Sequence, residues 1–275
     1  MKTTYIKLMA SLLVCLSIHA GYAQSMAGRG KFETKKGEID NGYNFWVYTP
    51  DGYDTDDHAH PLIIFLHGAS LCGKNLDRVR RYGVLDAIDR GKIIPALVAA
   101  PQNPGGAWNP SKINDLLEWM KTHYRVDESR VYVLGMSLGG YGTMDFAGTY
   151  PEKVAAAMAL CGGCSLKNKD GLGTLPFWIM HGTADRAVSI KASKTVVDYL
   201  QQTKQDRLLR YDWLQGGSHG VLARLFYLQK TYDWLFCHSL KDSPRTVDRS
   251  FDITKEDIAS TYNELREFSK MYDKD

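Results

Sequence analysis

The pentapeptide Gly135-Met136-Ser137-Leu138-Gly139 is the segment of this chain whose residue types point most directly to chemistry. It follows the apolar run Val131–Leu134 and opens a stretch of helical periodicity, which is the strand-turn-helix context of a nucleophile elbow. The glycines are needed because the turn is sharp, and the serine oxygen is held exposed above the sheet. Ser137 is therefore predicted to be a nucleophile. The alternative is a glycine-rich turn at a tight strand–helix contact.

A serine hydroxyl is a poor nucleophile at neutral pH and needs a base that is itself oriented by a third group. Along chains that carry such an elbow, the order is serine, acid, histidine. His219 lies between glycines on a predicted flexible loop after the last predicted strand, from which it could reach back to the elbow. His181 precedes the candidate acid and His238 lies beyond the final helix, so we predict that His219 is the base.

Asp185 is the predicted acid because it closely follows the apolar strand Phe177–Met180. Its carboxylate would hold the imidazole of His219 in the required tautomer. Asp206 falls in a polar turn and Asp212 within a strand, so both fit this role less well. The alternative is that Asp185 only caps the helix that follows it.

The segment Leu66-His67-Gly68-Ala69 ends an earlier strand, and the loop after it should direct a backbone N–H at the developing oxyanion. We predict that the N–H groups of Ala69 and Leu138 form the oxyanion hole. His67 is then a structural residue packed under the loop. Trp108, in a Gly-rich loop, could stack on a sugar or an aromatic acyl group of the substrate, and core packing is an equal alternative.

Other ligand-binding motifs are absent or incomplete in the sequence. The stretch Gly68–Asn75 nearly matches a phosphate-binding loop, but Asn75 stands where the Mg²⁺-binding Ser or Thr should be. No HExxH, EF-hand or clustered His/Cys pattern occurs. The sequence therefore predicts no metal and no cofactor.

Short apolar runs alternate with stretches of helical period from residue 44 onward, which predicts an α/β fold with a mostly parallel, twisted sheet and helices on both faces. The expected strands are Phe45–Thr49, Leu62–Leu66, Ala96–Ala100, Val131–Leu134, Ala155–Leu160, Phe177–Met180 and Leu209–Leu214. The expected helices are Ile113–Thr122, Leu138–Thr149, Ile190–Gln201 and Val221–Leu235. Ser137 and Asp185 are 48 residues apart and Asp185 and His219 are 34 apart, which leaves no room for a separate lid domain.

The chain has 275 residues, 44% of them hydrophobic and 24% charged, which excludes a disordered chain and a small disulfide scaffold. Residues 1–23 have the features of a signal peptide, with Lys2 and Lys7 before an apolar run and small residues before a cleavage point at Gln24. The run from Leu8 to Ile18 is too short to span a bilayer. We therefore expect a periplasmic or secreted protein that is not membrane-bound after cleavage.

The balance of 34 basic and 31 acidic residues contains no dense basic cluster, so nucleic acid is not an expected partner. Export would leave Cys72, Cys161, Cys164 and Cys237 where disulfides persist, but four cysteines allow three pairings and the sequence selects none. The pair Cys161 and Cys164 has the spacing of a redox motif without thioredoxin-like surroundings, which favours small residues at a strand end. The oligomeric state is not determined.

Residues 24–240 are predicted to form one catalytic domain, followed by a charged helical extension over residues 241–275. Within the extension, apolar residues recur every three to four positions over Glu256–Met271. This stripe predicts a helix that docks on the domain, and a helix that binds a partner is the alternative.

Together these motifs resemble the α/β-hydrolase superfamily, and within it the bacterial esterases and predicted peptidases related to dienelactone hydrolase, feruloyl esterase and the prolyl-oligopeptidase catalytic domain. The resemblance runs from about Phe45 to Leu235. It depends on Pro61–Gly68, Ala100–Gln102 with Trp108, Gly135–Gly140, Cys161–Gly163, Trp178–Gly182 with Asp185, and Tyr232–Leu235. The loop His67–Gly73 lacks the charged pair that relatives often have, and Val221 and Leu222 stand where relatives often have a Trp. The substrate of those relatives therefore does not transfer with the motifs.

The resemblance and the predicted triad together imply an exported serine carboxylic-ester hydrolase that forms an acyl-enzyme. The expected substrate is an ester, with an acetyl or feruloyl ester of plant polysaccharide as the favoured case. A serine peptidase of prolyl-oligopeptidase type is the first alternative. A catalytically inactive hydrolase fold that binds glycans is the second.

Overall fold

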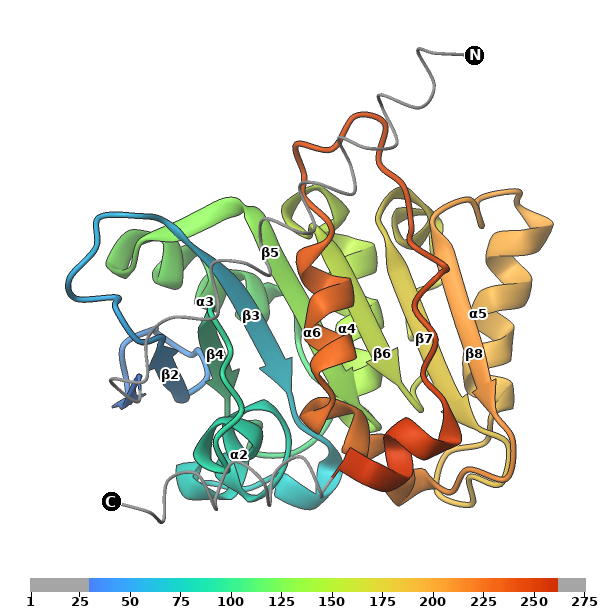
Figure 1. Ribbon diagram of the computed structural model, residues 1–275, viewed down its shortest axis with the longest axis horizontal. Helices are drawn as coiled ribbons and strands as arrows, with labels where there is room; N and C mark the ends of the chain where they lie inside the picture. The colour runs from blue at the N-terminus through green and yellow to red at the C-terminus, as the bar shows by residue number, and fades with distance from the viewer. Residues whose placement is uncertain (1–29, 262–275) are drawn as a thin grey trace.

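A computed structural model describes residues 30–261 of the chain, which form an eight-stranded sheet with helices on both faces (Figure 1). The strands are β1 (Lys31–Lys35), β2 (Phe45–Thr49), β3 (His60–Leu66), β4 (Leu97–Pro101), β5 (Val126–Met136), β6 (Ala156–Leu160), β7 (Phe177–Gly182) and β8 (Leu209–Leu214). The α-helices are α2 (Val84–Asp89), α3 (Pro110–His123), α4 (Leu138–Thr149), α5 (Lys191–Gln202) and α6 (Gln229–Phe236). The 3₁₀ helices are η1 (Ala69–Leu71), η2 (Leu76–Arg81), η3 (Pro151–Lys153), η4 (Asp170–Thr174) and η5 (His219–Tyr227).

The strands are arranged in the order β1-β2-β4-β3-β5-β6-β7-β8. The pairs β1–β2 and β2–β4 are antiparallel, and all pairs from β4 to β8 are parallel. The carboxyl ends of β5, β6, β7 and β8 therefore meet at one edge of the sheet. Because loops at this edge hold the ligands of open α/β sheets, it is the expected place for a site.

The parallel strands are buried on both faces, as their near-continuous apolar sequences predict. In β3, Ile63 and Phe65 belong to a cluster shared with α2 and α6, whereas Leu62 and Ile64 belong to a cluster shared with α3, α4 and α5. Figure 1 shows these two groups of helices on opposite faces. The predicted α/β-hydrolase fold is confirmed, and no inserted lid domain interrupts residues 30–261.

The expected elements are present with small shifts of their ends, but two differences matter. The sequence analysis missed β1, an edge strand whose residues Lys31–Lys35 are mostly polar and exposed. The predicted single helix Val221–Leu235 is wrong, because η5 and α6 are separated at Leu228, which has an extended backbone (φ −85°, ψ 132°). Leu222, Leu225 and the residues of α6 share one buried cluster, so their apolar spacing gives no sign of the break.

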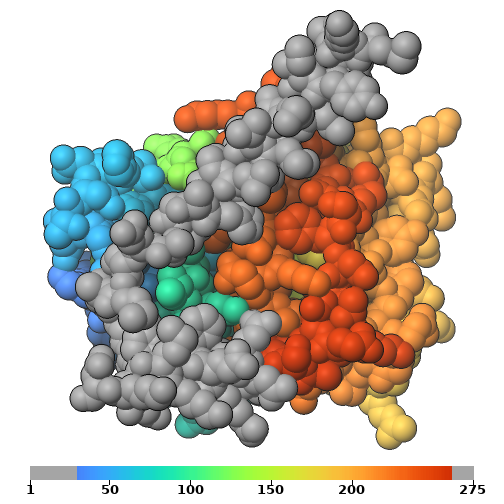
Figure 2. Space-filling view, viewed as in Figure 1, coloured from blue at the N-terminus to red at the C-terminus, as the bar shows by residue number. Residues whose placement is uncertain are grey.

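The segment that follows α6 packs back on the domain as far as the structure describes it. The guanidinium of Arg245 donates to the carbonyl oxygen of Val154 at 3.0 Å, and that of Arg249 donates to the carbonyl of Leu209 at 2.9 Å. Residues 255–261 are helical, and Ile258 is buried. In the space-filling view, the orange and red residues of this region form much of the central face (Figure 2).

Ile258, in the described part of the predicted C-terminal helix, packs against the domain, and residues 262–271 of that helix lie outside the described residues. The predicted signal peptide, residues 1–23, also lies outside them. Between residues 30 and 261, no helix has both the length and the apolar character needed to cross a bilayer.

Candidate active site

Ser137 occupies a strained turn between β5 and α4. Its backbone angles are φ 59° and ψ −121°, a combination that residues other than glycine rarely adopt. The turn is held on both sides: the N–H of Ser137 donates to the carbonyl of Leu160 at 2.8 Å, and its carbonyl accepts from the N–H of Tyr141 at 3.0 Å. Strain of this kind persists only where the surrounding structure enforces it, which is the geometry expected of a nucleophile elbow.

The glycines around Ser137 allow close approach of backbones. A Cβ atom placed on Gly135 would lie 2.4 Å from the carbonyl oxygen of Gly139, and one placed on Gly139 would lie 1.8 Å from the carbonyl oxygen of Leu66. Neither position could hold a side chain without moving the backbone. The start of α4 is thereby pressed against the end of β3 and the loop that follows it.

The loop after β3 brings a candidate oxyanion hole to Ser137. A Cβ atom on Gly68 would lie 3.4 Å from the Cβ of Ser137, so the two backbones are adjacent. Ala69 begins η1 and Leu138 begins α4. The first N–H groups of a helix have no acceptor inside that helix, so both are suited to hold an anionic oxygen. The sequence analysis missed Tyr82, which supports this loop. Its hydroxyl oxygen accepts a hydrogen bond from the N–H of Gly68 at 2.9 Å.

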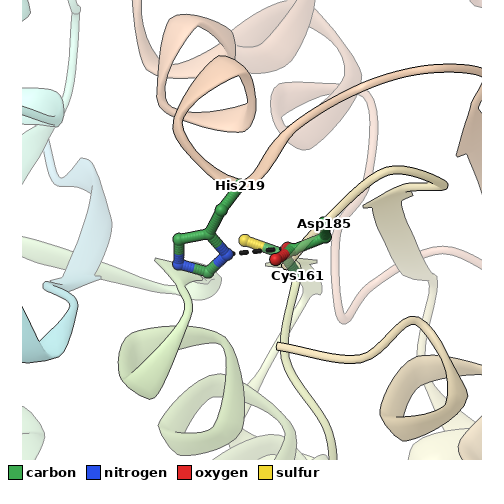
Figure 3. A group of neighbouring side chains, drawn as sticks. All are labelled: Cys161, Asp185 and His219. Atoms are coloured by element: carbon green, nitrogen blue, oxygen red, sulfur yellow. Dashed lines mark hydrogen bonds and ion pairs between the residues drawn. The ribbon is translucent and has the colours of Figure 1, made fainter. Parts of the chain in front are cut away.

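Asp185 and His219 form a hydrogen-bonded pair at the same edge of the sheet. Nδ1 of His219 lies 2.7 Å from Oδ2 of Asp185, whose side chain is fully buried, while the His219 side chain is 24% exposed (Figure 3). Since the carboxylate is bonded to Nδ1, the other ring nitrogen, Nε2, points away from Asp185 (Figure 3). This is the arrangement in which an imidazole can accept a proton at Nε2.

The position of His219 differs from the sequence expectation in one respect. It opens the 3₁₀ helix η5 instead of lying in a flexible loop. Leu222 and Leu225 of η5 are completely buried. Packing of these apolar side chains fixes the helix and, with it, the direction of the imidazole.

The carboxylate of Asp185 also holds its own loop. Its Oδ1 accepts hydrogen bonds from the N–H of Ala187 at 2.8 Å and from that of Val188 at 2.9 Å. Burial by itself would raise the pKa of Asp185, but the hydrogen bonds from Val188, His219 and Ala187 outweigh burial and hold the pKa below its usual range. Asp185 is therefore the anion that the predicted role requires, and it is not the cap of α5, whose N-cap is Ile190.

The alternative acid Asp212 has a different set of partners. Its Oδ2 accepts from the indole N–H of Trp178 at 2.6 Å and from the guanidinium of Arg210 at 3.0 Å. The bond from Trp178 joins β7 to β8 and the bond from Arg210 lies within β8, so both contacts of Asp212 support the sheet.

Cys161 lies beside the Asp185–His219 pair, a position for which the sequence analysis did not single it out. It follows β6 with a left-handed backbone (φ 40°), and its Sγ and the ligand atoms of Asp185 and His219 all lie within 4.8 Å of one another (Figure 3). Burial raises the pKa of the Cys161 thiol, so the sulfur stays protonated. Cys161 directly follows the last residue of β6, Leu160, which agrees with the interpretation of this segment as a strand end.

These three side chains are the group among residues 30–261 whose composition would suit a metal ion. Two ligands of a tetrahedral zinc ion lie about 3.3 Å apart. The 2.7 Å separation of Nδ1 and Oδ2 is instead that of a direct charge-assisted hydrogen bond, and the third donor is a protonated thiol. The arrangement fits a proton-transfer pair better than a metal centre.

His67 and Trp108 support the loop that carries Ala69. Nδ1 of His67 donates to the carbonyl of Gly68 at 2.8 Å, and its Nε2 accepts from the N–H of Asn103 at 3.1 Å. The indole N–H of Trp108 donates to the carbonyl of His67 at 3.2 Å, and Trp108 is only 4% exposed. The structural role expected of His67 fits these contacts. For Trp108 they favour core packing over stacking on a substrate, because little of the ring is accessible.

The buried imidazole of His67 predicts a pH-dependent stability. Burial lowers the pKa of His67 to about 4, because protonation would place a charge in the interior and break the hydrogen bond from Asn103. Between pH 6.5 and 4, the unfolded chain binds a proton at this histidine and the folded chain does not. The free energy of unfolding should therefore decrease as the pH is lowered from 6.5 to 4, by up to about 3 kcal/mol from His67 alone.

Urea unfolding of the wild type and of His67→Gln at pH 7.5, 6.5, 5.5 and 4.5 measures this contribution. The variant should be less stable at neutral pH and should lose less stability on acidification. Parallel curves for the two proteins would show that His67 does not titrate as proposed.

Comparisons with known proteins agree with this architecture. Residues 37–215 match the model of the Esterase family. An esterase of Mycobacterium tuberculosis is 27% identical over 158 residues, which cover 52% of this chain and 33% of that protein. Acetylxylan esterase A of Aspergillus awamori is 24% identical over 187 residues, covering 60% and 59% of the two chains. The chain thus spans about a third of the first relative and less than two thirds of the second.

Solved structures show the same fold. A thermostable esterase superposes with a TM-score of 0.62 at 25% identity, covering 77% of this chain and 63% of that one. The feruloyl esterase module from Clostridium thermocellum superposes with a TM-score of 0.57 at 17% identity, covering 76% and 88%. With its α/β-hydrolase fold, its elbow at Ser137 and a family match over most of the described residues, this chain belongs to the Esterase family.

Proposed function

We propose that this protein is a serine carboxylic-ester hydrolase that works through an acyl-enzyme, with Ser137, His219 and Asp185 as its catalytic triad. The observation that carries the proposal is the 2.7 Å hydrogen bond between His219 and the buried Asp185, at the sheet edge where Ser137 occupies its strained turn. Membership of the Esterase family supports the same reaction class.

In the proposed reaction, Oγ of Ser137 attacks the ester carbonyl while Nε2 of His219 takes the hydroxyl proton. The imidazolium that forms is stabilised by Asp185, and the N–H groups of Ala69 and Leu138 bind the oxyanion. His219 then returns the proton to the leaving alcohol, and water deprotonated by the same imidazole releases the acid. No cofactor enters these steps.

For the substrate, we propose an acetyl or feruloyl ester of a plant polysaccharide. The relationship to acetylxylan esterase A favours acetyl groups on xylan. Initial rates on acetylated xylan, methyl ferulate, p-nitrophenyl acetate and a prolyl p-nitroanilide distinguish the cases. We expect release of acetate from xylan and turnover of the simple acetate ester. Cleavage of the anilide with no ester hydrolysis would instead establish the peptidase alternative.

Labelling by a fluorophosphonate probe separates an enzyme from an inactive glycan-binding relative. A working triad should give covalent labelling, and mass spectrometry of the tryptic peptide should place the label on Ser137. Glycan binding without labelling would favour the inactive alternative.

We further propose that the protein is exported to the periplasm or the medium, with residues 24–240 as its catalytic domain and residues 241–275 as an extension. The features of residues 1–23 support export. N-terminal sequencing of protein recovered outside the cytoplasm should begin at Gln24. Recovery of the uncleaved chain from the cytoplasm alone would contradict export.

A further inference from the structure

His181, which has no role in the proposed reaction, places a second imidazole on the candidate acid. It lies in β7, and its side chain is completely buried. Its Nε2 is 3.2 Å from Oδ2 of Asp185, the same oxygen that holds His219, and 3.0 Å from the carbonyl oxygen of Val188. The carboxylate is therefore shared between two histidines.

The neighbours of His181 determine which nitrogen carries its proton. Both partners of Nε2 are acceptors, so Nε2 must be the protonated nitrogen. Burial lowers the pKa of His181, which favours the neutral ring. Nδ1 is then an acceptor and lies 2.8 Å from the hydroxyl oxygen of Ser193, whose single proton it shares with the carbonyl of Gly162, 2.7 Å from the same oxygen.

These contacts join Asp185 to two rigid elements. Ser193 belongs to α5 and is completely buried, and Gly162 follows β6 beside Cys161. A carboxylate has about four sites that accept hydrogen bonds. Here Oδ1 accepts from the N–H groups of Ala187 and Val188, and Oδ2 faces the N–H groups of His219 and His181. Three hydrogen bonds and the close contact with His181 therefore restrain the rotation of the carboxylate.

We propose that His181 is a positioning residue for the catalytic acid: its Nε2–H, which bonds the carbonyl of Val188 and lies beside Oδ2 of Asp185, restrains the carboxylate and reduces its attraction for the His219 imidazolium. The inference rests on the proposed function, because it concerns the same triad. It predicts that the two histidines are coupled through one oxygen atom.

Two substitutions at position 181 separate donation from packing. His181→Leu fills similar volume without a donor, whereas His181→Gln can place an N–H near the position of Nε2. On p-nitrophenyl acetate, the Leu variant should lose about 10- to 100-fold in kcat with KM little changed, as expected when a catalytic group is misplaced. The Gln variant should recover most of this loss.

The pH profile gives a readout that loss of packing would not move. The titratable groups facing His219 from neighbouring elements are Asp185, His181 and Cys161. Without the donor at position 181, Asp185 should hold the imidazolium of His219 more tightly. The acidic limb of kcat/KM should then shift to higher pH, by about 0.5 to 1 unit in His181→Leu and much less in His181→Gln.

His238→Leu is the matched control. His238 is also a buried histidine, 3% exposed, and its Nδ1 bonds the carbonyl of Trp234 within α6. This variant should lower the unfolding temperature without shifting the pH profile. Ser193→Ala, which removes the outer link to His181, should shift the limb in the same direction as His181→Leu by a smaller amount.

Nuclear magnetic resonance distinguishes failure of this inference from failure of the proposed function. The titration midpoint of the His219 imidazole is measured in Ser137→Ala, with and without His181→Leu, so that turnover is not needed. An upward shift with His181→Leu supports the proposal, and an unchanged midpoint overturns it. Full esterase activity of Ser137→Ala would instead refute the proposed function, whatever the midpoint does.

Discussion

Replacing Ser137 by alanine is expected to lower kcat on p-nitrophenyl acetate by roughly 10⁶-fold, with the folded structure retained. The substitution removes only the hydroxyl group, and no other side chain can form the acyl-enzyme from the same strained turn. The residual rate should reflect only the oxyanion hole and substrate binding, about 10³–10⁴-fold above the uncatalysed reaction. Steady-state rates at saturating p-nitrophenyl acetate measure this residual kcat directly.

Ser165→Ala is the control for this variant, since Ser165 is an exposed serine on the loop that follows β6. It should keep wild-type activity and remain labelled by the fluorophosphonate. Wild-type activity in Ser137→Ala would mean that the nucleophile lies elsewhere. The unfolding temperature of Ser137→Ala should not fall, because alanine also has to adopt the strained φ of 59° and the Ser137 hydroxyl makes no hydrogen bond to another residue between positions 30 and 261.

Replacing Asp185 by asparagine should lower kcat by about 10⁴-fold. The amide oxygen can still accept from Ala187 and Val188, so the loop should keep its shape. The amide nitrogen would then face Nδ1 of His219 and, as a donor, would favour the tautomer with the proton on Nε2. An imidazole in that tautomer has no lone pair for the proton of Ser137.

Asp212→Asn provides the comparison for this prediction. Asp212 is also a carboxylate near the carboxyl ends of the strands, but its partners are Trp178 and Arg210. We expect this variant to lower the unfolding temperature and to keep most of the activity. Equal losses of activity in the two variants would show that Asp185 acts through general stability and not through His219.

The depressed pKa of Asp185 adds a pH dependence to the stability of the site. A carboxylate whose pKa is lower in the folded than in the unfolded state stabilises the fold above the unfolded value, near 3.9. This contribution is lost as the pH falls through the folded value. It therefore acts at lower pH than the contribution of His67, which is lost between pH 6.5 and 4.

The fold and the positions of the candidate triad were predictable because their signals are local. Apolar runs such as Leu62–Leu66 and Val131–Leu134 mark buried parallel strands, and each candidate residue closely follows one of these runs. Parallel strands then bring their carboxyl ends to one edge. The predicted α4, Leu138–Thr149, and the predicted β8, Leu209–Leu214, match the structure at both ends.

Predictions failed where the sequence gives the same signal for different structures. The apolar spacing of Val221–Leu235 suits one helix as well as two, and only the folded structure shows that the extended backbone at Leu228 separates η5 from α6. Trp108 gave equal grounds for a substrate contact and a core residue, and its contact with the carbonyl of His67 favours the core. The exposed fraction of the Trp108 ring depends on the residues that pack around it in the fold, so it could not be predicted from the residue type.

The α/β architecture, the turn at Ser137 and the proposed order of serine, acid and histidine were predictable from local signals, because periodicity, glycine spacing and strand ends are properties of neighbouring residues. Three contacts could be seen only in the folded chain: Asp185 Oδ2 faces two histidines, Cys161 lies beside the pair and η5 holds His219. Those contacts join β6, β7, α5 and η5, which are separate along the chain. They exist only once the sheet and its two helical layers have packed.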